Sequence, residues 1–141
     1  MGSGGALTLH ASTVAIDGRA VMLTGASGAG KSDLALRLID RGALLVSDDY
    51  TVVRREADAL IAAPPATIRG RIEVRGLGIA ELLAAGDTPV ALVVRLGAAA
   101  ERMPEREWCE IAGVRLRSLA LDPFTASAPI KVEIALRQEL P

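Results

Sequence analysis

A glycine-rich segment constrains the fold of this chain more than any other feature of its sequence. Residues 25–32 read Gly-Ala-Ser-Gly-Ala-Gly-Lys-Ser, a full match to the pattern G-x-x-x-x-G-K-[ST]. An apolar run of strand length, Val21–Thr24, precedes the segment, and an amphipathic stretch, Ser32–Arg41, follows it. Leu34 and Leu38 share one face of that stretch, and Gly42 is placed as a stop. The pattern therefore predicts a strand, a tight loop and a helix, in that order.

The predicted loop has the chemistry of a phosphate-binding loop. Glycines let successive backbone N–H groups turn toward one anion, and the N-terminus of the following helix adds unpaired donors and partial positive charge. Lys31 is expected to reach the β and γ phosphates of a nucleotide, and Ser32 to supply a hydroxyl to Mg²⁺. The alternative interpretation is a glycine-rich turn before an ordinary helix. The predicted nucleotide-binding residues are Gly25, Ala26, Ser27, Gly28, Ala29, Gly30, Lys31 and Ser32.

Two adjacent carboxylates stand where the second half of such a site is expected. Asp48 and Asp49 follow an apolar run, Ala43–Ser47, that predicts a buried strand. Side chains alternate along a strand, so the two aspartates point in different directions unless the chain turns there. One can then serve the metal, while the other accepts a proton from an attacking hydroxyl. By itself, Asp-Asp-Tyr would suit a plain turn equally well.

A predicted hairpin brings the single histidine toward the loop. Thr13–Ile16 and Ala20–Thr24 flank Asp17-Gly18, a pair suited to a type I′ turn. If these two residues form the turn, the register places His10 beside Gly25, at the mouth of the loop. An imidazole there could hydrogen-bond a carboxylate or a phosphate, although a lone histidine is more often an ordinary surface or core residue.

The rest of the chain predicts mostly short strands. The last segment is ambiguous, because alternating apolar residues suit a strand, whereas Ser127 followed by Pro129 resembles a helix start; we favour the helix. The other expected elements are a hairpin of strands 52–55 and 60–63, a half-buried strand at 68–74, a short helix at 79–85 ended by Gly86, a buried strand at 90–96, a surface loop at 97–106 and a hairpin over 111–121 about Ala112-Gly113.

Composition narrows the classes of partner. The 141 residues are 50% hydrophobic, which predicts one domain over residues 1–141, with residues 1–6 flexible. A net charge of -1 and three aromatic residues (one each of Trp, Tyr and Phe) argue against a nucleic-acid partner. Apolar runs are too short to span a membrane and no signal peptide is visible, so no membrane partner and a cytoplasmic location are expected. One Cys and one His exclude the usual zinc ligand sets, which leaves a hard, oxygen-bound metal.

Two stretches resemble the kinase domain of bacterial HPr kinase/phosphorylase. The first is Gly25–Asp49, and the second is Ile72–Ile79, read as Ile-Glu-Val-Arg-Gly-Leu-Gly-Ile and preceded by Ala63-Pro64-Pro65. The likeness covers residues 7–96 well and thins beyond them. It implies an α/β P-loop fold akin to phosphoenolpyruvate carboxykinase, with a mixed sheet and an N-terminal β-hairpin. It also implies an ATP-dependent protein serine kinase that uses ATP and Mg²⁺ and acts on an HPr-type phosphocarrier protein of the phosphotransferase system.

The resemblance also implies roles for individual residues. By position, Asp49 matches the family's proton acceptor, His10 its catalytic histidine, and Lys31 its phosphate lysine. Ser32 and Glu73 match its magnesium ligands, and Asp48 joins them as a metal candidate on its chemistry. From the residues alone, Glu73 and Arg75 share one strand face and would equally suit a surface ion pair.

Departures from the family pattern limit what is carried over. Thr125-Ala126-Ser127 stand where the family has Gly-Arg-Asn, so a catalytic arginine is missing, and this argues against phosphorylase activity. Full-length members also have an N-terminal domain and further C-terminal helices, whereas short single-domain relatives occur in α-proteobacteria. The family forms hexamers, so a homo-oligomer is a further expectation. The main alternative is a regulatory module that binds ATP without transferring phosphate; a small-molecule kinase ranks last.

Overall fold

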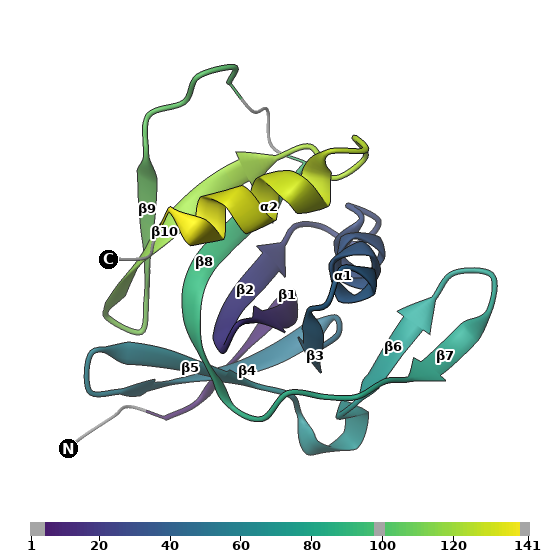
Figure 1. Ribbon diagram of the computed structural model, residues 1–141. Helices are drawn as coiled ribbons and strands as arrows, with labels where there is room; N and C mark the ends of the chain where they lie inside the picture. Colours follow the sequence, from purple (N-terminus) through teal and green to yellow (C-terminus); the bar gives the residue numbers. More distant parts are fainter. Residues whose placement is uncertain (1–4, 98–100, 139–141) are drawn as a thin grey trace.

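The strand that precedes the glycine-rich loop lies inside a mixed β-sheet. The computed structural model describes residues 5–97 and 101–138, and Figure 1 shows its two helices against the large sheet. In chain order the elements are β1 (Leu7–Ile16), β2 (Arg19–Thr24), α1 (Lys31–Asp40), β3 (Leu44–Ser47), β4 (Tyr50–Glu56), β5 (Ala59–Ala63), a 3₁₀ helix (Ala66–Ile68), β6 (Arg71–Val74), β7 (Gly78–Glu81), β8 (Thr88–Leu96), β9 (Glu107–Ile111), β10 (Val114–Leu121) and α2 (Ala128–Arg137). Residues 1–6 are expected to be flexible, and residues 1–4 among them lie outside the described residues.

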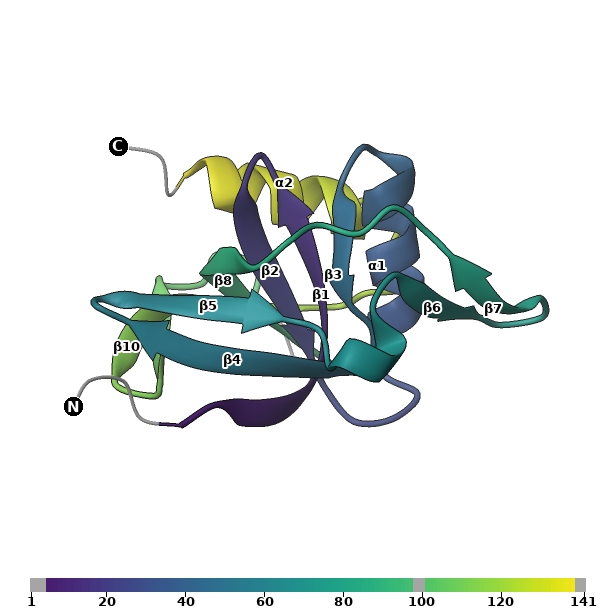
Figure 2. The same ribbon diagram turned by 90° about the horizontal axis from the view of Figure 1, so that it is seen from below.

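The strands form two layers of sheet, and the long strands β1 and β8 belong to both layers. In the larger layer β3, β1, β2, β8, β10 and β9 lie side by side, and β2 and β10 run parallel to β8. In the smaller layer β4 and β5 connect the start of β1 to the start of β8. Figure 2 shows β4 and β5 crossing beneath the larger layer. This is the mixed α/β architecture that the sequence predicts.

The N-terminal hairpin has the predicted register. β1 and β2 pair antiparallel as far as Ala11 opposite Thr24. Asp17 and Gly18 have φ angles of 50° and 77°, as both central residues of a type I′ turn require. β1 continues past Ala11, and His10 there pairs with the first residue of β4. The hairpin therefore carries His10 past the end of β2, where the glycine-rich loop begins.

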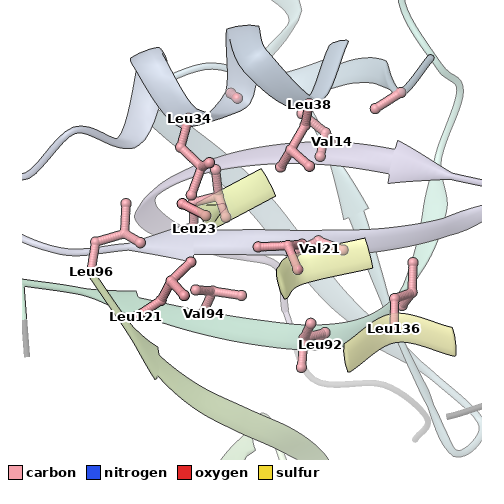
Figure 3. Packing of buried hydrophobic residues seen from close by; sticks show 14 of the residues in the cluster. Val14, Val21, Leu23, Leu34, Leu38, Leu92, Val94, Leu96, Leu121 and Leu136 are labelled. Atoms are coloured by element: carbon pink, nitrogen blue, oxygen red, sulfur yellow. The ribbon is translucent and has the colours of Figure 1, made fainter. Parts of the chain in front are cut away.

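Separate apolar clusters cover the two faces of the larger layer. Along β2, Val21 and Leu23 face the helices, whereas Ala20 and Met22 face the smaller layer. Burial on both faces explains why this strand reads as a continuous apolar run. The helix-side cluster is drawn in Figure 3, where α1 contributes Leu34 and Leu38, α2 contributes Leu136, and the strands contribute Val14, Val21, Leu23, Leu92, Val94, Leu96 and Leu121.

Helix α1 begins and ends within one residue of the predicted stretch, Ser32–Arg41. It starts at Lys31, directly after the glycine-rich loop. At its C-terminus Gly42 has a φ of 112°; its N–H donates to the carbonyl of Ile39, and the N–H of Ala43 donates to that of Leu38. These two hydrogen bonds form a Schellman motif, in which the residue just past the end of the helix must tolerate a positive φ angle. Gly42 thus fixes the direction in which the chain enters β3.

The structure corrects two expected elements. Residues 79–85 form no helix: Gly78–Glu81 is strand β7, which pairs antiparallel with β6. Helix-forming side chains there are overridden because the backbone groups of β6 need a partner strand. The expected strand at 68–74 is shorter, since β6 begins only at Arg71. In Figures 1 and 2 the β6–β7 hairpin projects from the body beside α1.

The remaining expected elements are confirmed in the described residues; of the surface loop expected at 97–106, residues 98–100 lie outside them. The hairpins β4–β5 and β9–β10 turn at Ala57-Asp58 and Ala112-Gly113, and the final segment is helix α2, with Pro129 in its first turn. The strand expected at 43–47 is β3, which is buried except at its first residue, Leu44. Across the described ranges, no helix is both long and apolar enough to cross a bilayer.

Candidate active site

The glycine-rich loop connects β2 to α1 through conformations that favour glycine. Gly25 has a φ of 151°, and a Cβ there would lie 3.0 Å from both the carbonyl oxygen of Leu96 and the Cβ of Ala29. Because one of these neighbours is backbone of β8, a side chain at Gly25 would displace the loop from the sheet. Gly30, the residue before α1, has a φ of 98°. The spacing of the glycines is therefore a steric requirement of this strand–loop–helix connection.

Lys31 is held within the loop. Its side chain is 5% exposed, and Nζ donates to the carbonyl oxygens of Gly25 at 2.8 Å and Ala26 at 3.0 Å. An ammonium group has three donors, so these two bonds leave one donor for a further acceptor. The positive charge therefore lies under the curve of the loop, where an anion bound by its N–H groups would need a counter-charge.

Asp48 is the buried centre of a hydrogen-bond network. Its side chain accepts from the hydroxyl of Ser32 at 2.5 Å, from the hydroxyl of Ser12 at 3.0 Å and from the backbone N–H of Glu73 at 3.0 Å. These bonds join α1, β1 and β6 at one carboxylate, and they compensate for its burial. Asp48 therefore fixes the position of the Ser32 hydroxyl at the first turn of α1.

The Asp49 carboxylate bonds a different partner from that of Asp48, and the reason is a turn of the chain after β3 rather than alternation along a strand. Asp49 has a φ of 66°, in the left-handed region, and Oδ1 lies 2.7 Å from Nε2 of His10. The side chains of His10 and Asp49 are 38% and 53% exposed, so solvent and a large partner can reach them. Of the two partners considered for the His10 imidazole, a carboxylate or a phosphate, the structure shows the carboxylate of Asp49.

Sequence reasoning missed two residues at this site, Ser12, which holds both aspartates, and Tyr50, which packs against His10. Ser12 is fully buried, and its hydroxyl accepts the N–H of Asp49 at 3.0 Å while donating to Asp48. Tyr50 stacks on the ring of His10, with centroids 5.2 Å apart. One signal for Ser12 was available, because alternation along a strand places it on the same face as His10. Nothing local distinguished Tyr50 from a turn residue.

A cavity of about 880 Å³ opens between the loop, α1 and the β6–β7 hairpin. This lies within the roughly 300–1,000 Å³ typical of small-molecule sites. The lining includes Ser27, Gly28, Gly30, Lys31 and Ser32 of the loop, Asp49, and Glu73 and Arg75 beyond β3. Two separate predictions, the loop and the second signature stretch, thus meet at one cavity.

The comparisons with known proteins agree with this geometry. The family model of the HPr serine kinase C-terminal domain matches residues 5–99, more than half of the chain. The chain belongs to this family. HPr kinase/phosphorylases of Listeria welshimeri and Listeria monocytogenes are 44% identical over 78 residues, which is 55% of this chain and 25% of theirs. The chain thus matches about a quarter of the length of these curated relatives.

A solved structure resembles nearly the whole HPr kinase-like chain. The Hpr(Ser) kinase/phosphatase from Coxiella burnetii superposes with a TM-score of 0.81 at 29% identity, covering 94% of this chain and 95% of that one. A match that covers 94% of the chain must extend past residue 99, where the family model ends. The family resemblance predicted from the two sequence stretches is confirmed.

The donor set of this family member suits a magnesium ion. Within the described ranges, no three His, Cys, Asp or Glu side chains converge as a metal cage. Ser32 and Glu73 instead line the cavity, and the buried Asp48 accepts from the Ser32 hydroxyl and from the backbone N–H of Glu73. Mg²⁺ prefers oxygen ligands, keeps several of its waters and takes others from phosphates, so it needs no complete protein cage. The residues present therefore fit Mg²⁺ bound together with a nucleotide.

Proposed function

We propose that the chain is an ATP-dependent protein serine kinase acting on an HPr-type phosphocarrier protein. The observation that carries the proposal is the position of Asp49, a partly exposed carboxylate that lines the same cavity as the phosphate-binding loop and is hydrogen-bonded to His10. The serine of a protein substrate must be able to reach the carboxylate that accepts its proton, and that carboxylate must lie beside the terminal phosphate. Membership of the HPr serine kinase C-terminal domain family supports the choice of substrate.

In the proposed reaction Asp49 accepts the proton of the attacking serine hydroxyl. As the serine oxygen bonds to the γ-phosphorus, the bond to the ADP oxygen breaks in line with it. Nε2 of His10 lies 2.7 Å from Oδ1 of Asp49, which lines the cavity, and this bond helps to orient the carboxylate. Lys31 and the loop N–H groups stabilise the charge on the transferred group; a bound Mg²⁺ would supply further positive charge to the phosphate oxygens. Ser32, Asp48 and Glu73 are the residues proposed to hold that ion.

The segment before α2 bears on the alternative functions. Residues 125–127 are Thr-Ala-Ser, where an arginine is expected for the phosphorylase reaction. Attack by inorganic phosphate on phosphoserine brings two anions together and needs cationic help. We therefore propose kinase activity without phosphorylase activity. The same difference keeps one second candidate open, a regulatory module that binds ATP without transferring phosphate.

We further propose that the chain acts as one nucleotide-binding domain in the cytoplasm. Its single cysteine, Cys109, is free, as suits a reducing compartment. Nucleic acid and membrane are not among the proposed partners. Self-association stays a prediction, and sedimentation measurements test it.

The deciding experiment combines phosphate transfer with nucleotide binding. The chain is incubated with ATP, Mg²⁺ and an HPr-type carrier, and the carrier's intact mass is measured; a gain of one phosphate rejects the regulatory alternative. Asp49→Asn should lower the transfer rate by about 10²- to 10⁴-fold and leave nucleotide affinity nearly unchanged. Asp58→Asn, in the exposed β4–β5 turn, is the matched control. If Asp49→Asn loses binding together with transfer, Asp49 serves the metal instead.

A further inference from the structure

The cavity carries one exposed aromatic side chain that the reaction described above does not use. Phe124, the chain's single phenylalanine, is 72% exposed and lines the cavity together with the loop. The other two aromatic residues are engaged elsewhere: Tyr50 stacks on His10, and Trp108 lies under the guanidinium of Arg115 on the sheet. Because Phe124 lines the cavity, its exposed phenyl ring is available to pack against an apolar or aromatic face of a ligand.

Hydrogen bonds hold Phe124 in place. The guanidinium of Arg37, on α1, donates to the carbonyl oxygens of Pro123 and Thr125, on either side of the ring. The backbone N–H of Phe124 donates to the Asp122 carboxylate at 2.9 Å. A segment tied at these points loses little conformational freedom when a ligand contacts it, which favours binding.

The ring also lies directly against the glycine-rich loop. A Cβ built on Gly30 would be 3.3 Å from Cε1 of Phe124 and 3.3 Å from Cγ of Pro123. Gly30 precedes Lys31 and Ser32, so the ring stands beside the part of the loop that is proposed to hold phosphates. The absence of a side chain at Gly30 is what allows this close approach.

The acidic groups and the aromatic ring that line the cavity come from different segments, and this indicates an orientation for a bound nucleotide. The acidic groups, Asp49 and Glu73, lie on the side of β3 and β6, where the terminal phosphate and the metal are proposed to be handled. Phe124 comes from the segment before α2 and meets the loop at Gly30. A nucleoside triphosphate with its γ-phosphate beside Asp49 has its nucleoside at the opposite end of the phosphate chain. The cavity's aromatic wall is therefore available to that end.

We infer that Phe124 is the nucleobase-binding residue of this site and stacks on the base of the bound nucleotide. The inference rests on the proposed nucleotide-binding function and adds to it the group that recognises the base. Stacking uses the π-face that every base has, so it contributes affinity with little discrimination between bases. ATP and GTP should then depend on Phe124 to a similar degree.

Titration calorimetry with two kinds of ligand tests this inference. ATP and GTP carry a base, whereas inorganic tripolyphosphate presents the phosphates alone; each is titrated with Mg²⁺ present. Phe124→Ala should weaken ATP and GTP binding by about five- to one-hundred-fold and leave tripolyphosphate affinity unchanged. Phe124→Trp keeps an aromatic face and should restore binding of both nucleotides. Trp108→Ala removes an aromatic residue on β9, away from α1 and the loop (Figure 1), and should change none of the affinities.

The outcomes separate this inference from the function on which it rests. Equal loss of ATP and tripolyphosphate in Phe124→Ala would mean that the ring only supports the loop, and the inference fails. It fails as well if ATP affinity is unchanged in that variant, or if the unmodified chain binds tripolyphosphate as tightly as ATP. If the unmodified chain binds neither ligand, the proposed function itself is refuted. Because Phe124 is largely exposed, the substitutions should leave the fold intact, and thermal unfolding checks this.

Discussion

Ser12 offers a sharp test of how the aspartates are held. Its hydroxyl bonds both the Asp48 carboxylate and the Asp49 N–H, each at 3.0 Å, from a fully buried position on β1. Ser12→Ala removes both bonds with almost no change in volume, so the cost is that of lost hydrogen bonds rather than of a cavity. Asp48 keeps its bonds from Ser32 and Glu73, whereas the Asp49 N–H loses its acceptor.

The expected loss follows from these contacts. One bond to a charged acceptor disappears and one partly buried donor is left unpaired, so the free energy of unfolding should fall by about 2–3 kcal/mol. For a chain of this size that corresponds to a decrease in Tm of roughly 5–12 °C. Asp49 also adopts a left-handed conformation that its neighbours must stabilise. Without the Ser12 bond we expect its carboxylate to be misplaced and the transfer rate to fall about 10- to 100-fold.

Urea unfolding, phosphate transfer to the carrier and calorimetry with ADP measure the three consequences. Nucleotide affinity should be nearly unchanged, because the Ser32–Asp48 bond is retained. Ser118→Ala is the control: this serine is also buried, but it lies on β10 and its hydroxyl accepts from the partly exposed Arg95 rather than bonding an aspartate, so neither transfer nor binding should change. If Ser12→Ala unfolds with the free energy of the unmodified chain and transfers phosphate at full rate, the network does not position Asp49.

Two further predictions concern the loop and the single thiol. Gly25→Ala places a Cβ against Leu96 and Ala29, so it should lower the free energy of unfolding by about 1–3 kcal/mol and abolish binding of ATP and tripolyphosphate. Gly18→Ala is the control, because Gly18 also has a positive φ angle but has open space around it, and both affinities should be kept. Calorimetry on the two variants checks the prediction. Burial raises the pKa of the Cys109 thiol above its ordinary value. At pH 8 less thiolate is present than in the unfolded chain, so a thiol-specific reagent should react more slowly with the folded protein and its rate should keep rising above pH 9; a plateau below that pH would contradict the prediction.

Local patterns fixed much of the fold because their causes lie within a few residues. The Asp17-Gly18 turn sets the hairpin register through its positive φ angles. Gly42 ends α1 in a Schellman motif, which glycine accommodates because it tolerates a positive φ angle. The same kind of reasoning failed at 79–85, where helix propensity lost to pairing between β6 and β7. Propensity is a weak preference that tertiary context overrides.

The active site divides along the same line. The sequence by itself determined the glycine-rich loop between β2 and α1, the acidic pair after β3 and the position of His10 near the start of the loop, because each follows from a motif or from strand register. The tertiary structure alone decided that Ser12 holds both aspartates and that Phe124 lies against Gly30. These contacts join segments far apart in the chain, and they form only once the sheet and α2 have packed around the loop. Packing brings such groups together without any local pattern, so only the folded chain reveals them.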